Sequence, residues 1–371
     1  MRASPSPESV LAAVRDLLPA IAASASDVDR RGAVDAEVIG LLQDAGYFAL
    51  LQPPAFGGLG ADPDVYLTAT RELSWACTST GWLAGWLGLN SWGLSIRDER
   101  VLRDIWGADP HALLCSSYAP TGRLHRVEGG FTLSGRWSRC TGAHHSTWLS
   151  AAALRIGSDG AAQDFLAVLV PRSDYVVEST WNGLGLRGIG ADDVFVSGAF
   201  VPNHRTFSWL HTEQNADATA LDRLPQPTVF TLAGTMPLLG AAQRALEICS
   251  PAADSDPLGA TAMSAADIVL SLMQIRRNVA DLVACVRAGG YPDAELVLRT
   301  RRDQVMACDR AVRAVRTAVY GVADDEVDGQ VLERVWRDVQ TARKHVASNV
   351  EQVLAVAGRY ALGLNVDDLI W

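Results

Sequence analysis

The feature that most constrains the fold is a block of β-type sequence enclosed by two long helical regions. Residues 116–148 read SSYAPTGRLHRVEGGFTLSGRWSRCTGAHHSTW, in which apolar and polar residues alternate around a Gly129-Gly130 turn. This alternation is typical of a β-hairpin. Further strand patterns extend the block to about residue 207, at 149–153, 165–170 and 194–201. A small sheet with hydroxyls and histidines at its turns, set between helices, indicates a ligand site.

The region before this block has helical patterns. Ser6 and Pro7 suit the cap and the first turn of a helix. A second helix is expected over 34–43, and Asp62-Pro63 begins a third. We therefore expect an N-terminal helical domain over residues 1–112.

Tryptophans mark one face of the third predicted helix. Trp75, Trp82 and Trp86 are spaced by seven and four, so their indoles share a face, and Asn90 follows on the same side. Ordinary core packing accounts for such a face as well as a ligand pocket does. If the face lines a pocket, three indoles favour a large flat ligand.

The region after the β block is helical to the end of the chain. Beyond a polar linker at 215–227, helices are expected over 236–248, 297–319 and 331–356, within a four-helix bundle. A basic row on the helix over 297–319 is interpreted as solvated or salt-bridged: Arg299, Arg302, Arg310 and Arg313. The chain is thus expected to be α+β and mostly α, with a central β-domain over 113–225 and a helical bundle domain over 226–371.

Composition excludes several classes of function. The 371 residues are 49% apolar and carry a net charge of −10, which argues against nucleic acid and anionic membrane as partners. Six cysteines without CxxC spacing predict neither a zinc site nor a disulfide framework. No uncharged apolar run approaches ~18 residues, and no signal peptide is evident, so we expect a cytoplasmic protein.

Seven motifs in order carry a resemblance to a known family. They are LLQPPAFGGLGADP (50–63), STGW (79–82), SSYAPTG (116–122), GLGLRGIG (183–190), FVPNHR (200–205), RRDQV (301–305) and VWRDVQTARKH (335–345). With these the chain resembles the oxygenase components of two-component flavin-dependent monooxygenases, of the 3-HSA hydroxylase and p-hydroxyphenylacetate hydroxylase type. The resemblance implies an acyl-CoA dehydrogenase-like fold. The glycines of 183–190 do not follow a strand and open a helix, so we reject a dinucleotide-binding loop and expect a turn beside the flavin.

The resemblance also implies a reaction and a set of residues. Reduced FMN or FAD from a separate reductase would react with oxygen to a C4a-hydroperoxide and oxygenate an aromatic, polycyclic or indolic substrate, without a metal. His345 and Thr141 match the catalytic positions, at the peroxide and at flavin N5. The matched flavin contacts are Trp82, Ser116, Ser117, Tyr118, Cys140, Thr141, His345 and, at a subunit boundary, Val322 and Ala323. The matched substrate contacts are Trp86, Asn90, Ser117 and His145. A homotetramer, or at least a dimer, is expected.

Three positions depart from the family pattern. Asn90 stands where the hydroxylases carry a histidine that meets the substrate phenol, and Gln340 replaces another histidine. Residues 248–267 contain no Arg or Lys where relatives hold the flavin phosphate. A phosphate held without a cation loses charge-assisted bonds.

Other functions remain open at this level. A flavin-independent descendant, such as a cyclase or a binding protein, is consistent with the three departures. An acyl-CoA dehydrogenase would need a carboxylate base, but the C-terminal segment reads GRYALGLNVDD (358–368) without the Tyr-Glu-Gly motif. The adjacent His144 and His145 are expected to point apart, which disfavours a metal pair.

Overall fold

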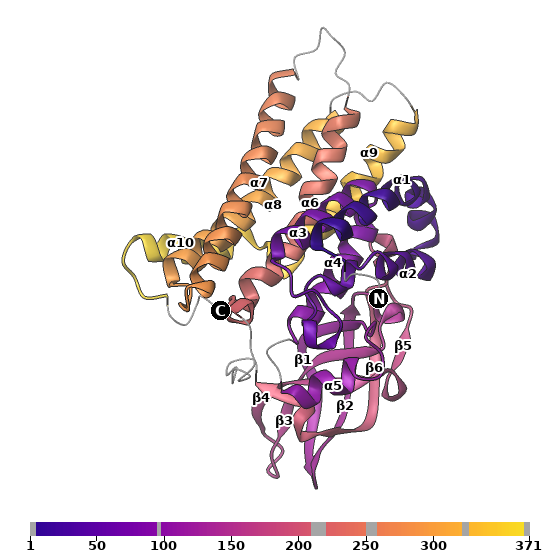
Figure 1. The fold of residues 1–371 in the computed structure, drawn as a ribbon, viewed down its shortest axis with the longest axis vertical. Coiled ribbons are helices and arrows are strands. Elements are labelled where there is room, and N and C mark those ends of the chain that lie inside the picture. Colours follow the sequence, from indigo (N-terminus) through magenta and orange to yellow (C-terminus); the bar gives the residue numbers. More distant parts are fainter. Residues whose placement is uncertain (1–4, 95–97, 209–219, 250–257, 321–325, 367–371) are drawn as a thin grey trace.

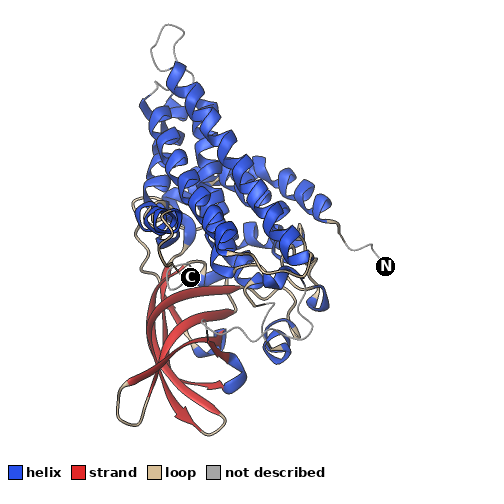
Figure 2. Ribbon diagram, turned by 90° about the vertical axis from the view of Figure 1, so that its left-hand side faces the viewer, coloured by secondary structure: helices blue, strands red, loops and turns tan. Residues whose placement is uncertain are grey.

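The structure, a computed structural model, describes residues 5–94, 98–208, 220–249, 258–320 and 326–366. Helices lie above a single sheet, and a long helical bundle extends away from that sheet (Figures 1 and 2). The helices are α1 (Pro7–Arg31), α2 (Ala36–Asp44), α3 (Pro63–Ala76), α4 (Thr78–Trp92), α5 (Glu99–Trp106), α6 (Gln226–Ile248), α7 (Leu258–Arg287), α8 (Ala294–Tyr320), α9 (Glu326–Ala342) and α10 (Val350–Ala361). This order confirms the predicted α+β, mostly α class.

The sheet forms from the predicted β block. Its strands are β1 (Leu114–Val127), β2 (Gly130–Cys140), β3 (Trp148–Ile156), β4 (Ala162–Pro171), β5 (Val176–Glu178), β6 (Asp192–Pro202) and β7 (Thr206–Ser208), in the order β5-β6-β2-β1-β3-β4-β7. β1 and β3 are parallel, and the other pairs in this order are antiparallel. The predicted hairpin pairs Val127 with Gly130 around Gly129, whose φ of 75° favours glycine.

The first helix begins as the sequence predicts. The Ser9 N–H donates to the Ser6 Oγ at 3.2 Å, and Pro7 occupies the first turn. Buried side chains at Val10, Val14 and Ile21 form the inner face of α1. The local signals therefore suffice to place this helix.

The expected third helix is two helices, so that prediction was wrong. Cys77 is extended (φ −151°, ψ 113°) and separates α3 from α4. A Cβ on Gly81 would lie 1.9 Å from the Ser74 Oγ, so the two helices pack too closely to continue as one rod. Trp75 consequently leaves the face of Trp82 and Trp86, and its Nε1 donates to Glu247 of α6 at 2.6 Å.

Helices α6, α7, α8 and α9 form the predicted bundle (Figure 1). The buried face of α8 is rich in small residues, including Ala307, Ala311, Ala314 and Ala318. The predicted basic row is salt-bridged: Arg299 to Asp281, Arg302 to Asp303, Arg310 to Asp267, and Arg313 to Asp267 and Asp309.

The expected last helix over 331–356 is also broken. It divides into α9, a short 3₁₀ turn η8 (Val346–Ser348) and α10. His345 thus lies in the break and not on a helix.

Two helices, α1 and α7, are long and apolar enough to cross a membrane by length and composition alone. Each of these helices also buries one face against the rest of the protein, as core helices do. Val14 on α1 and Ile275 on α7 are examples of such buried residues.

Candidate functional site

The turn that follows β2 lies directly against α4. Gly142 has a φ of 75°, and its N–H donates to the carbonyls of Ile189 and Gly190, both at 3.1 Å. A Cβ on Gly142 would lie 2.7 Å from Leu87 and 2.8 Å from Leu83 of α4. Only glycine satisfies both the conformation and the contact. The turn therefore fixes Thr141, the residue before it, beside the tryptophan-bearing helix.

An aromatic cluster forms where four parts of the chain meet. We define it as Trp82 and Trp86 of α4, Tyr118 of β1, Phe230 of α6 and His345. The ring centroids of Trp86 and His345 are 4.9 Å apart, those of Trp82 and His345 5.6 Å, and those of Trp82 and Trp86 6.0 Å. Phe230 lies 6.4 Å from both Trp86 and Tyr118. Four of the five residues were predicted from the sequence to contact a ligand.

The side of the cluster that α6 forms, which we call its floor, was not predicted. Phe230 and Gly234 lie one turn apart on α6, and a Cβ on Gly234 would lie 3.4 Å from Trp86 and 3.8 Å from Trp82. Their spacing of four residues was the available signal, because it places both on one face of a helix. The predicted start of that helix at residue 236 concealed it, since α6 begins ten residues earlier.

His345 has a defined tautomer. The Ala347 N–H donates to its Nδ1 at 3.2 Å, so in the neutral ring the proton lies on Nε2. Burial lowers the pKa of His345 to about 4, and the ring is therefore neutral at pH 7. Within the described residues no group accepts the Nε2 proton. His345 is therefore a neutral hydrogen-bond donor at pH 7.

Asn90 and the serines of β1 are joined by hydrogen bonds. The Asn90 Nδ2 donates to the Leu114 carbonyl at 2.8 Å, and the Ser116 hydroxyl donates to the Asn90 Oδ1 at 3.1 Å. The Ser117 hydroxyl donates to the Ser138 carbonyl at 3.3 Å. Asn90 is buried and its amide is held at both ends, so it connects α4 to β1. An amide in this position offers no base.

Helix α9 holds the glycine-rich loop that supports this site. The N–H of Leu186 donates to Asp338, and the N–H of Gly185 donates to the Thr341 Oγ1 at 2.9 Å. A Cβ on Gly185 would lie 2.1 Å from the carbonyl carbon of Arg337, so the loop touches the helix backbone. Burial raises the pKa of Asp338 to about 7. One helix thus leads into His345 and holds the loop whose carbonyls hold Gly142.

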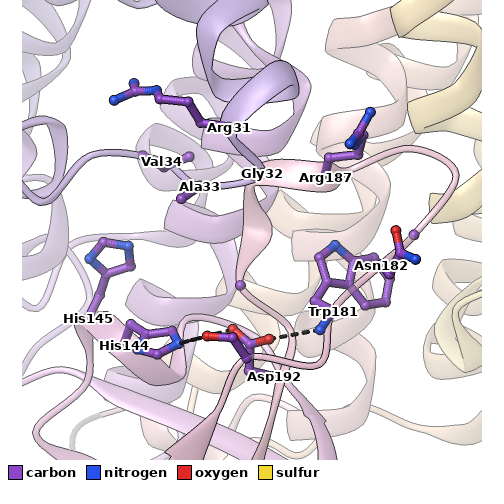
Figure 3. Close-up of a pocket in the computed structure, with 14 residues that line it drawn as sticks. Arg31, Gly32, Ala33, Val34, His144, His145, Trp181, Asn182, Arg187 and Asp192 are labelled. Atoms are coloured by element: carbon purple, nitrogen blue, oxygen red, sulfur yellow. Dashed lines mark hydrogen bonds and ion pairs between the residues drawn. The ribbon is translucent and has the colours of Figure 1, made fainter.

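The same loop lines a separate cavity of about 440 Å³, which includes none of the aromatic cluster in its lining (Figure 3). His144 lies 3.2 Å from Asp192, while His145 extends toward the chain after α1, so the two histidines point apart as predicted. Burial and the neighbouring His144 lower the pKa of His145. The structure therefore places His145 in this cavity and not in the aromatic cluster. In the part of the chain that is described, no group of three His, Cys, Asp or Glu side chains is placed to hold a metal ion.

The remaining predicted residues have mixed outcomes. The Cys140 thiol is buried in the sheet, 3.5 Å from the Trp137 carbonyl, and is not accessible to a ligand. The Gln340 Oε1 accepts from Arg343 at 3.3 Å. Val322, Ala323 and residues 250–257 of the Arg-free segment lie outside the described residues.

The donors around the cluster fit a flavin ring. The Trp82 Nε1 is buried and has no hydrogen-bond partner among the described residues. The His345 Nε2–H and the Thr141 hydroxyl are partly exposed, and no described residue accepts from them. A buried donor is rarely left without a partner, so the Trp82 indole suits a flat ligand with nitrogen or oxygen acceptors along its edge.

Comparisons with known proteins agree with this geometry. Residues 4–95 match the family described as acyl-CoA dehydrogenase, N-terminal domain. The flavin-dependent monooxygenase oxygenase subunit HsaA of Rhodococcus jostii (strain RHA1) is 33% identical, across 95% of this chain and 98% of the relative. The oxygenase component of the FADH(2)-dependent resorcinol hydroxylase of Rhizobium sp. (strain MTP-10005) is 31% identical, across 95% and 93%. The crystal structure of the HsaA monooxygenase from M. tuberculosis superposes with a TM-score of 0.92 at 32% identity, covering 99% and 100% of the two chains.

Proposed function

The chain belongs to the oxygenase subunits of flavin-dependent monooxygenases, with the acyl-CoA dehydrogenase-like fold, and from this premise we propose that it oxygenates an aromatic substrate with reduced flavin delivered by a separate reductase. One observation carries the proposal. The Trp82 Nε1 is buried in the aromatic cluster without a hydrogen-bond partner among the described residues, and the ring of His345 lies 5.6 Å from the Trp82 ring. The direct test is an anaerobic titration with reduced FMN and reduced FAD, followed by oxygen uptake and product analysis.

The residues divide the work between holding the cofactor and excluding water. Trp82, Thr141 and the backbone around Ser117 would hold the ring of a reduced FMN or FAD, which supplies the electrons that activate oxygen. The buried rings of Trp86 and Phe230 would help to exclude water from the bound cofactor. His345 is neutral at pH 7, so it would donate its Nε2 proton in a hydrogen bond to a negatively charged oxygen.

We further propose that the substrate is electron-rich without deprotonation. Histidine takes a phenol proton near neutral pH, but the Asn90 amide does not, and both ends of that amide are held by Leu114 and Ser116. An indole or a fused polycycle needs no base. The test supplies reduced flavin and compares 4-substituted phenols with indolic and polycyclic compounds, in wild type and Asn90→His. Efficient, well-coupled phenol hydroxylation by the wild type would contradict this.

Two other activities would give different results in the same assays. Absence of reduced-flavin binding would favour a flavin-independent enzyme or a binding protein on this fold. An acyl-CoA dehydrogenase needs a carboxylate base, and none of the five residues of the aromatic cluster is a carboxylate.

We also propose that the protein assembles as a homotetramer. The outer face of α7 exposes a row of large apolar side chains, namely Leu258, Met263, Val269, Leu270 and Met273, of which Met263 is 70% exposed. A helix face this apolar is typical of a protein contact. Light scattering at micromolar concentration should give a tetramer, and Met273→Glu should weaken it. A stable wild-type monomer would contradict the proposal.

A further inference from the structure

Three arginines close together on α8 have different partners. Arg299 pairs with Asp281 of α7, and Arg302 pairs with Asp303 at 2.8 Å. Arg301 lies between them and is partly buried. Its Nη1 donates to the Gln304 Oε1 at 2.6 Å, and no described carboxylate pairs with it. Arg301 is therefore a partly buried cation without a described counter-ion, close in the sequence to arginines that have one, and it lies on a different face of α8 from them.

This arrangement is costly unless an anion completes it. A guanidinium has five N–H donors, and Arg301 uses one of them within the described chain. Removing a charge from water without a counter-ion costs several kcal/mol. Burial lowers the pKa of Arg301 to about 10, so the group still carries its charge at neutral pH. The missing partner is therefore an acceptor with negative charge.

Hydrogen bonds connect this guanidinium to the segment that carries His345. The Gln304 Nε2 donates to the Ala347 carbonyl at 3.2 Å and to the Thr235 Oγ1 at 2.7 Å. Ala347 is the residue whose N–H donates to His345. Thr235 follows Gly234, which lies beneath the indoles of the aromatic cluster. Arg301 is thus one hydrogen-bonded side chain away from both the floor of the cluster and its histidine.

We propose that Arg301 binds an oxyanion at the candidate site, either a carboxylate on the aromatic substrate or the phosphate of the flavin. The inference rests on the proposed function and specifies which ligands the site takes. A guanidinium binds two oxygens of a carboxylate or phosphate in one plane, so it fixes direction as well as charge. A ring held by the aromatic cluster and an anion held by Arg301 would be positioned at two points, which orients the ring for reaction.

The experiment measures binding, without turnover, to the full-length protein. The substrate arm compares indole-3-acetate with indole-3-acetamide in the flavin-loaded protein under anaerobic conditions. The flavin arm compares reduced FMN with reduced riboflavin. In one of the two arms, wild type should bind the charged ligand about 10- to 100-fold more tightly than the neutral one. This ratio of dissociation constants is what one charged hydrogen-bonded contact contributes. Arg301→Gln should abolish that preference and leave affinity for the neutral ligand unchanged.

Matched variants keep the outcome decisive. Arg302→Gln removes a neighbouring arginine that is already paired with Asp303, and should leave both preferences intact. Arg301→Lys keeps the buried charge, so it should fold, but it should lose most of the preference because an ammonium cannot bind two oxygens in one plane.

Two results would overturn the inference. One is a wild type that shows neither preference. The other is a folded Arg301→Gln protein that keeps every charged-ligand preference seen in wild type. If that variant keeps these preferences but no longer assembles, Arg301 serves subunit contact and not ligand binding. Oxygen uptake tests the proposed function separately. If wild type takes up no oxygen with reduced flavin and neutral aromatic compounds, the proposed function is wrong, whatever the binding experiments show.

Discussion

The aromatic cluster and the 440 Å³ cavity differ in burial and in the partners of their polar groups. In the cluster, Trp82 is 3% and Trp86 8% exposed, and the buried Trp82 Nε1 has no hydrogen-bond partner among the described residues. The cavity is lined in part by charged and polar residues, and several of these are already paired, as His144 is with Asp192.

This difference shows that the cavity and the unpartnered hydrogen-bond donor of Trp82 lie in different parts of the molecule. The cavity has room, but the Asp192 carboxylate already accepts from the N–H groups of Thr180 and Trp181, both at 2.8 Å. The cluster offers the unpartnered Nε1 donor of Trp82 among buried rings, where a hydrogen bond is strengthened by the low dielectric. We therefore propose that catalysis takes place at the cluster, and the predictions below test that assignment.

Removal of the histidine side chain should have the largest effect. His345→Ala should lower product formed per reduced flavin by about 10²-fold or more, with the balance released as hydrogen peroxide. Product and peroxide are measured together in a single turnover. Because the pKa of His345 is about 4, we expect no inflection near pH 6.5 in the wild-type profile. Unchanged coupling in the variant would make His345 structural.

Asp338 of α9 tests how much the hydrogen bond to Leu186 in the loop 183–190 contributes to stability. Burial raises its pKa from 3.8 to about 7, so the folded state holds a proton that the unfolded state releases in this range. Stability should therefore fall as pH rises from about 4 to 7 and level off above it, by roughly 1–4 kcal/mol. Asp338→Asn keeps an acceptor for Leu186 and should remove this slope.

The measurement is the urea midpoint of wild type and Asp338→Asn at pH 5 and pH 8. Asp16→Asn is the matched control, because Asp16 is an exposed carboxylate on α1 and should leave the slope unchanged. Parallel curves for wild type and Asp338→Asn would show that Asp338 does not titrate in this window.

A pair of tryptophan variants separates the cluster from the rest of the helical domain. Trp86→Leu should weaken binding of an indolic ligand by about tenfold, because a buried aromatic contact is lost. Trp75→Leu should not change it, since Trp75 lies against Glu247 and Arg244. Isothermal titration measures both. Equal losses would mean that the ligand does not meet the cluster.

The cavity should give the smallest effects. Arg187→Ala and His145→Ala should each change turnover by less than about twofold, because Arg187 is exposed and neither residue belongs to the aromatic cluster. Steady-state turnover and coupling are the measurements. A loss of tenfold or more for His145→Ala alone would give the cavity a share in substrate binding, as the family resemblance implied for that residue.

Local signals in the sequence were enough for the periodic elements. The cap at Ser6, the glycine turn at Gly129 and the alternation of the strands each act over a few residues, so they can be found without knowing the fold. The family resemblance predicted more than local structure, because it assigned Trp82, Ser116, Thr141 and His345 to one flavin site before their contacts were known. The loop 183–190 was predicted as a turn that is not a dinucleotide loop, and the structure shows no α-helix that begins in it.

What only the tertiary structure decided depends on contacts between distant segments. The break at Cys77 follows from the close crossing of Gly81 and Ser74, and the exclusion of Trp75 from the cluster follows from that break. The break at His345 is held by Ala347, whose carbonyl is bound by Gln304, 43 residues away. The lack of an ion-pair partner for Arg301 is likewise not visible in RRDQV, because the sequence shows three charged residues and not which of them pair. Helical periodicity is encoded within one turn, whereas partners are chosen by packing across the whole chain.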